Sequence, residues 1–90
     1  MANTKSAIKR LRSTERKRLR NQVHRGRART AVKKARHLMN EGRIEEAREA
    51  VYVAVSALDK AASKGVIRKN NAARRKSRLM RRLNQIERAA

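Results

Sequence analysis

The sequence has no cysteine, proline, tryptophan or phenylalanine, and Tyr52 is its only aromatic residue. The absence of cysteine excludes disulfides and thiolate metal sites and fits a reducing compartment. One tyrosine cannot form the aromatic platform on which single-strand binders and RRM domains stack bases. The alternation of β-branched and aromatic residues that barrels and sandwiches need is also missing. The apolar residues that remain are small or aliphatic, and they predict closely packed helices.

Long apolar runs are missing too. No stretch of about 18 apolar residues is present, so no transmembrane helix is expected. The chain is charged from Lys5 onward and lacks the apolar segment of a secretory signal. A basic helix on an anionic membrane would need bulky apolar residues opposite the charge, and the N-terminal segment offers only Ile8 and Leu11. The sequence therefore predicts a cytoplasmic protein with no membrane partner.

Acidic residues are scarce and unevenly placed. The chain has 27 Lys and Arg against 7 Asp and Glu in 90 residues, a net charge of +20. Residues 1–36 carry fourteen cations and one acid, residues 37–65 four cations and five acids, and residues 66–90 nine cations and one acid. Like charge at this density repels itself, so a partner must supply negative charge. Nucleic acid is the first expectation.

Apolar residues recur at helical spacing in three segments, which predicts an all-α fold with helices over about 4–40, 44–63 and 69–88. Thr4 or Asn3 is expected to cap the first helix, and Asn70 or Asn71 the third. Gly42 and Gly65 suit the left-handed residue that follows a helix. The predicted core consists of the larger apolar residues on the facing stripes: Val32, Leu38, Met39, Val51, Val55, Leu58, Leu79, Leu83 and Ile86.

Helix lengths and short turns predict a three-helix bundle with an extension. The second and third helices are long enough to cover only about residues 20–40 of the first. Residues 3–19 should therefore project as a basic arm from the single domain formed by residues 1–90. Because the arm has little to bury, we expect it to be largely unstructured until an anionic partner neutralises it.

The candidate nucleic-acid ligands lie in the first and third helices, with the second as a neutral brace. The two basic runs at residues 16–20 and 68–76 are expected to meet near the base of the arm. Arginine predominates, and its planar fork suits bidentate phosphate contacts. The predicted RNA-binding residues are Lys5, Ser6, Lys9, Arg10, Arg12, Arg16, Lys17, Arg18, Arg20, Asn21, His24, Arg25, Arg27, Arg29, Lys33, Lys34, Arg68, Lys69, Asn70, Arg74, Arg75, Lys76 and Arg78.

The distribution of cations around the arm favours folded RNA over duplex DNA as the partner. Cations occupy nearly every angle around the arm, which suits the crevices between helices of folded RNA. Helix-turn-helix readers of DNA use a short recognition helix and a modest charge. The alternative is a histone-like protein that condenses DNA, because charge alone does not distinguish the two.

No catalytic site is recognisable. The carboxylates of Glu45, Glu46 and Glu49 suit the positive end of a helix dipole, and His24 and His37 lack partners at metal-ligand spacing. Tyr52 is expected to pack on the second helix, with stacking on a base as the less favoured alternative. Gly26 either permits a close approach or is merely tolerated. No enzymatic activity, metal, cofactor, small-molecule substrate or homo-oligomer is expected.

Three segments are distinctive: MANTKSA with the following Lys9 and Arg10, RARTAVKK at residues 27–34, and DKAASKGVIRKN at residues 59–70, continued by AAR and KSRL. They resemble the family of the twentieth protein of the bacterial small ribosomal subunit. The resemblance covers nearly the whole chain and implies a three-helix bundle with a long first helix that binds 16S ribosomal RNA in the small subunit. The chain departs from the family pattern at Arg68, where histidine is common, and at Ile8, where lysine is frequent.

Overall fold

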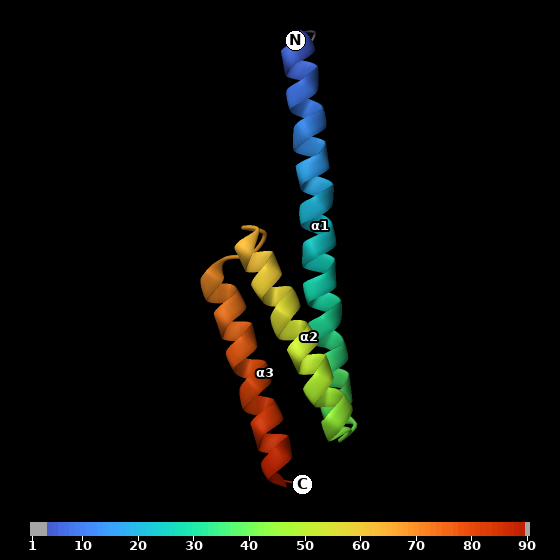
Figure 1. The fold of residues 1–90 in the computed structure, drawn as a ribbon, viewed down its shortest axis with the longest axis vertical. Helices are drawn as coiled ribbons and strands as arrows, with labels where there is room; N and C mark the ends of the chain where they lie inside the picture. The colour runs from blue at the N-terminus through green and yellow to red at the C-terminus, as the bar shows by residue number, and fades with distance from the viewer. Residues whose placement is uncertain (1–3, 90) are drawn as a thin grey trace.

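The computed structural model describes residues 4–89 and contains three helices: α1 (Lys5–Asn40), α2 (Ile44–Ser63) and α3 (Lys69–Ala89) (Figure 1). No strand occurs within this range. The molecule is elongated, with extents of 64 × 21 × 15 Å, because α1 continues well past the other two helices. The predicted all-α bundle with a projecting N-terminal helix is therefore confirmed.

The ends of the first two helices follow the predicted chemistry. The Thr4 hydroxyl accepts a hydrogen bond from the Ala7 amide at 3.2 Å, which makes Thr4 the N-cap of α1. Asn3, the other predicted cap, lies outside the described residues. Gly42 and Gly65 both have positive φ, at 75° and 74°, where a residue with a side chain would be strained. Each glycine therefore allows the chain to reverse after a helix.

α3 begins where it was predicted to begin, but its predicted caps were wrong. The helix begins at Lys69, and its first backbone bond runs from the Ala72 amide to the Arg68 carbonyl at 3.1 Å. Asn70 and Asn71 therefore lie inside the first turn and are not caps. The preceding Val66 is buried, at 7% exposure, so its packing fixes the path of the turn and the point where the helix can start.

The core is built from small and aliphatic side chains, and Val51 and Leu58 are its largest fully buried residues. Val55 and Ile86 pack against its edge and are half-buried, while the other predicted core residues are buried. Alanines with no exposed surface lie between the larger residues and let the helix axes approach closely. The buried cluster consists of Ala28, Val32, Ala35, Leu38, Met39, Ala47, Ala50, Val51, Ala54, Leu58, Ala72, Leu79 and Leu83.

The helices are not packed evenly around this core. α2 packs extensively against both neighbours, whereas α1 and α3 share few contacts. Figure 1 shows α1 and α3 converging toward the turn that joins α1 to α2 and separating toward the arm. At the converging end, the guanidinium of Arg82 donates a hydrogen bond to the side-chain oxygen of Asn40. The bundle is therefore closed at one end and splayed at the other.

The arm differs from the prediction in two respects. The buried face of α1 begins at Ala28, because Leu19 and Val23 are about half exposed (53% and 50%), so the bundle takes less of α1 than the apolar pattern suggested. The arm is also helical from Lys5 rather than unstructured. Its residues are mostly good helix formers without proline, and a helix that is anchored at one end can extend without a new nucleation step.

Candidate RNA interface

The Lys and Arg side chains of α1 form no ion pairs with the carboxylates of residues 4–89. All fourteen of its Lys and Arg side chains are exposed, and none lies within 4.0 Å of a carboxylate among residues 4–89. Every ion pair of that range uses a residue from position 37 onward. Because a solvated protein face normally mixes the two signs of charge, α1 presents a surface suited to a polyanion.

Two of the carboxylates instead join α2 to α3. Asp59 of α2 pairs with Lys76 of α3 at 2.9 Å, and Arg48 of α2 pairs with Glu87 of α3 at the same distance. Glu87 is the only acid of α3, so this helix also retains a large excess of positive charge. The predicted neutral role of α2 as a brace agrees with these pairs.

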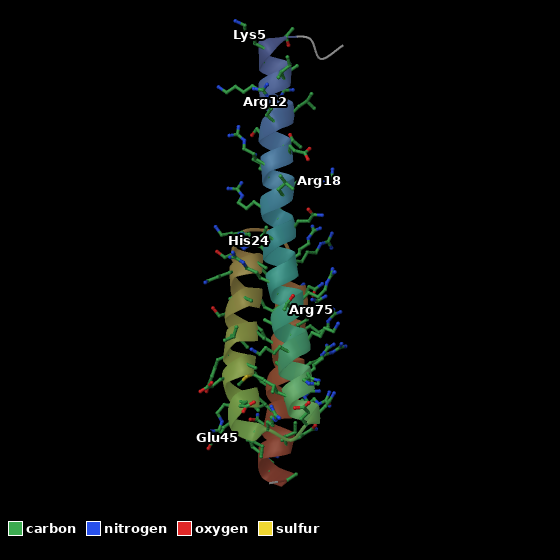
Figure 2. The ribbon with its side chains drawn as sticks, turned by 90° about the vertical axis from the view of Figure 1, so that its right-hand side faces the viewer. Lys5, Arg12, Arg18, His24, Glu45 and Arg75 are labelled. Carbon is green, nitrogen blue, oxygen red and sulfur yellow. The ribbon has the colours of Figure 1, made fainter. Side chains whose placement is uncertain are left out.

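One face of α3 adds arginines to the surface beside α1. Arg75, Arg78 and Arg82 follow a spacing of three and four and therefore share one side of the helix. Arg82 contacts Asn40, so this side of α3 is turned toward α1. In Figure 2, the labelled Arg75 of α3 and Arg18 of α1 project to the same side of the molecule, away from α2.

The hydrogen bond between Arg82 and Asn40 also shows which side of α1 faces α3. Arg29, Lys33 and Arg36 precede Asn40 at intervals of four, three and four residues, so all four lie on one side of α1. The side of α1 next to α3 is thus lined by cations, and no acid lies on it. We call this surface, formed by Arg29, Lys33, Arg36, Arg75, Arg78 and Arg82, the α1–α3 face.

The structure places the predicted ligands as follows. All are exposed except Asn21, His24 and Lys76, which are half-buried, and Lys76 is paired with Asp59. The basic runs at 16–20 and 68–76 lie toward the same end of the bundle, but they do not join into one site, since α1 and α3 are splayed there and share few contacts (Figure 1). The arm and the start of α3 therefore present separate cationic surfaces.

Lys60 and Lys64 of α2 lie close to the base of the arm, but they are not among the RNA-binding residues predicted from the sequence. Their position follows from His24, which lies where the arm meets the end of α2 (Figure 2). The pKa of His24 is lowered from the usual 6.5 by partial burial and by the positive charges of Lys64, Arg27, Arg20 and Lys60. In the sequence, Lys60 and Lys64 were interpreted only as favourable charges at a helix end. Their spacing of four residues places them on one side of α2, which was an available signal.

Arg36 and Arg82 were also missed, although both belong to the α1–α3 face. Residues 4–89 contain no group of three or more His, Asp or Glu side chains that could hold a metal ion. No helix within them is both long and apolar enough to cross a membrane.

Comparison with known proteins identifies the family. Residues 2–84 match the family model described as ribosomal protein S20. The chain belongs to the ribosomal protein S20 family. The small ribosomal subunit protein bS20 of Thermomicrobium roseum is 57% identical over 89 residues, which cover 99% of this chain and 90% of that protein. The bS20 proteins of Dictyoglomus thermophilum and Geobacillus kaustophilus are 52% and 51% identical, covering 94% and 97% of this chain and 91% and 98% of theirs. The resemblance noted in the sequence is thereby confirmed.

Proposed function

We propose that this S20-family protein is a structural component of the small ribosomal subunit and that it binds 16S ribosomal RNA directly. The observation that supports this most strongly is the set of fourteen α1 cations that have no carboxylate partner among residues 4–89. Lys and Arg that neutralise phosphates release condensed counterions, which gives strong binding at low salt. Its place of action is the ribosome in the cytoplasm, and its role requires no catalysis, cofactor or small-molecule substrate.

The shape of the molecule suggests how it acts on RNA. The arm presents cations on most of its sides and projects beyond the other two helices (Figure 1), so it can lie between two RNA helices and neutralise both backbones. The α1–α3 face and the start of α3 present further cations on the bundle. A rigid body with several cationic surfaces holds separate RNA segments at a fixed spacing, and this stabilises their packing.

Competition binding tests this function. Affinity for folded 16S ribosomal RNA and for duplex DNA is measured by filter binding across a salt series. We expect the RNA to bind more tightly at physiological salt. Equal affinity for both would support the DNA-condensing alternative and contradict the proposal, whereas a steep salt dependence is expected in either case.

A set of variants tests which part of the surface is used. Replacing Arg16, Arg18 and Arg20 together by glutamine should reduce the salt slope for 16S RNA by about three, since each phosphate contact contributes about one. Arg43→Gln is the control, because Arg43 pairs with Glu41 and Glu46 at the opposite end of the bundle. An unchanged salt slope for the triple variant would show that these three arginines do not contact RNA phosphates.

A further inference from the structure

A groove of about 800 Å³ runs between α1 and α2 at the arm end of the bundle. Its size falls within the range of about 300–1,000 Å³ that is usual for sites of small organic ligands. The groove does not belong to the α1–α3 face, since its walls come from the other side of α1 and from α2. It is lined by Val23, His24, Gly26, Arg27, Thr30, Ala31, Lys34, Tyr52, Val53, Ser56, Ala57 and Lys60.

The groove exposes an unusual amount of apolar surface. Tyr52, Val53 and Val23 line it and are 63%, 61% and 50% exposed. Tyr52 therefore does not pack in the bundle, contrary to the sequence-based expectation. The only aromatic ring of the protein is thus presented to solvent at the edge of a recess, where a flat partner can stack on it.

Positive charge surrounds the arm end of this groove. Arg27 lies on its α1 wall and Lys60 on its α2 wall, with His24 beside them. Arg20 and Lys64 lie close enough to act electrostatically on His24. None of these four cations has a carboxylate partner within 4.0 Å in the described chain. A phosphate at this end would meet unpaired cations from both helices.

The groove is less basic toward the α1–α2 turn. A second hollow shares part of its wall there, and Glu46 and Glu49 are among the residues that line this hollow. Figure 2 shows Glu45, of the same acidic run, at the end of the bundle farthest from the arm. Glu46 pairs with Arg43, and Lys34 lies on the same walls, so the charges of the second hollow balance. Phosphate is therefore attracted more strongly to the arm end of the groove, where positive charge is in excess.

We propose that this groove binds one unpaired nucleotide of the RNA, with its base on Tyr52 and Val53 and its phosphate between Arg27 and Lys60. The apolar wall and the ring match the face of a base, and the cations match the backbone that carries it. The assignment rests on the proposed function, because the nucleotide belongs to the same RNA that the arm and the α1–α3 face bind. It differs from those contacts in holding a base and not only phosphates.

The ring is tested by two substitutions at one exposed position. Tyr52→Phe keeps an aromatic surface, and Tyr52→Leu keeps apolar bulk without the ring. We expect Tyr52→Phe to bind folded 16S ribosomal RNA like the unchanged protein and Tyr52→Leu to bind about tenfold more weakly. Circular dichroism verifies that both variants retain the fold. Equal binding by all three proteins would show that no base stacks on Tyr52.

Direct contact is tested by ultraviolet cross-linking of the unchanged protein to folded 16S ribosomal RNA. After digestion with trypsin and nuclease, mass spectrometry should find a nucleotide on the peptide of residues 49–60, which contains Tyr52 and ends at Lys60. Adducts elsewhere, with none on this peptide, would overturn the assignment of the groove. Affinity is measured on the same sample, so a failure of the proposed function, with no preference for the RNA, is distinguished from a failure of the groove alone.

The proposed phosphate contact is tested by comparing two substitutions that each remove one positive charge. Lys60→Gln removes a cation at the arm end of the groove and should weaken binding about fivefold, with a salt slope lower by about one. Arg43→Gln removes a cation at the other end of the bundle, where Arg43 lines the second hollow and pairs with Glu46, and should have no effect on either quantity. Identical effects of the two substitutions would indicate general charge attraction and would contradict a located phosphate.

Discussion

The ammonium of Lys76 on α3 lies 2.9 Å from a carboxylate oxygen of Asp59 on α2. Its sequence neighbour Arg75 has no carboxylate partner among residues 4–89 and belongs to the α1–α3 face. Two adjacent cations of one helix therefore have different roles. Lys76, although predicted as an RNA ligand, helps to join α2 to α3, and Arg75 remains available to phosphate.

This difference predicts that removing the charge of Arg75 and removing the Asp59–Lys76 ion pair will affect RNA binding differently. Arg75→Gln should weaken binding to 16S ribosomal RNA about fivefold and lower the salt slope by about one. The double variant Asp59→Asn with Lys76→Gln leaves the net charge unchanged and should alter RNA affinity less than twofold. Its stability to urea should fall by about 1 kcal/mol at most, because exposed ion pairs contribute little. A larger loss of RNA binding in the double variant would show that Lys76 contacts RNA after all.

The half-buried His24 predicts a pH dependence of RNA binding. Partial burial and the charges of Lys64 and Arg27 lower its pKa below 6.5, so the imidazole is neutral near pH 7 in the free protein. A phosphate bound beside it favours the charged form and raises this pKa. Binding then takes up protons, and affinity should rise as pH falls below 7 and level off once pH is below the lowered pKa of the free protein.

The measurement is the dissociation constant at fixed salt between pH 5 and 8, a range of about three units chosen around the usual histidine pKa. His24→Gln should flatten the profile, whereas His37→Gln should not, since His37 pairs with Glu41 at the other end of the bundle. The stability of the free protein should depend on pH in the opposite direction and fall as pH is lowered. The pKa of His24 is lower in the folded than in the unfolded state, so its contribution to stability is present above 6.5 and is lost as pH falls toward the folded value.

The features that the sequence could predict are those set by local chemistry and helical period. Gly42 and Gly65 adopt the expected positive φ because no other residue does so without strain. The spacing of Val32, Leu38 and Met39 correctly identified the buried side of α1. In such cases each residue carries the information by itself or through its neighbours along one helix.

The features that the sequence could not predict depend on how the helices cross. The periodic pattern includes Leu19 and Val23, but the end of α2 is reached before it can cover them, so both remain about half exposed. The splay of α1 from α3 separates two basic runs that helix lengths alone would bring together. The same packing brings Lys60 and Lys64 of α2 close to His24. Crossing angles follow from side-chain interdigitation along the whole interface, which the period of one helix does not encode.

The same substitution is expected to have opposite effects at two glycines. A Cβ atom added at Gly26 or at Gly42 would meet no neighbouring atom within 4 Å, so only backbone preference matters. Gly26 lies within α1, and Gly26→Ala should stabilise the protein by about 0.5–1 kcal/mol. Gly42 has a φ of 75°, and Gly42→Ala should destabilise it by about 1 kcal/mol. Urea unfolding of the two variants measures both values, and a shift of both in the same direction would refute the argument.

The arm should be the least protected helical segment of the protein. Its helix extends from the bundle without burying side chains, so its hydrogen bonds can open from the end at almost no cost in free energy. Hydrogen exchange followed by mass spectrometry should find residues 9–19 exchanging within seconds, while residues 28–39, which include the buried Val32 and Ala35, exchange only by global unfolding.

Binding of 16S ribosomal RNA should slow exchange in the arm strongly, because phosphates remove the repulsion between its cations and the helix then gains a partner along its length. Residues 47–58 of α2 serve as the internal control, since the core side of that helix is already buried in the free protein. Slow exchange of residues 9–19 without RNA would show that the arm is stable by itself. In that case the RNA would bind a helix that rarely opens, and closing the frayed end of the arm would not reduce its affinity.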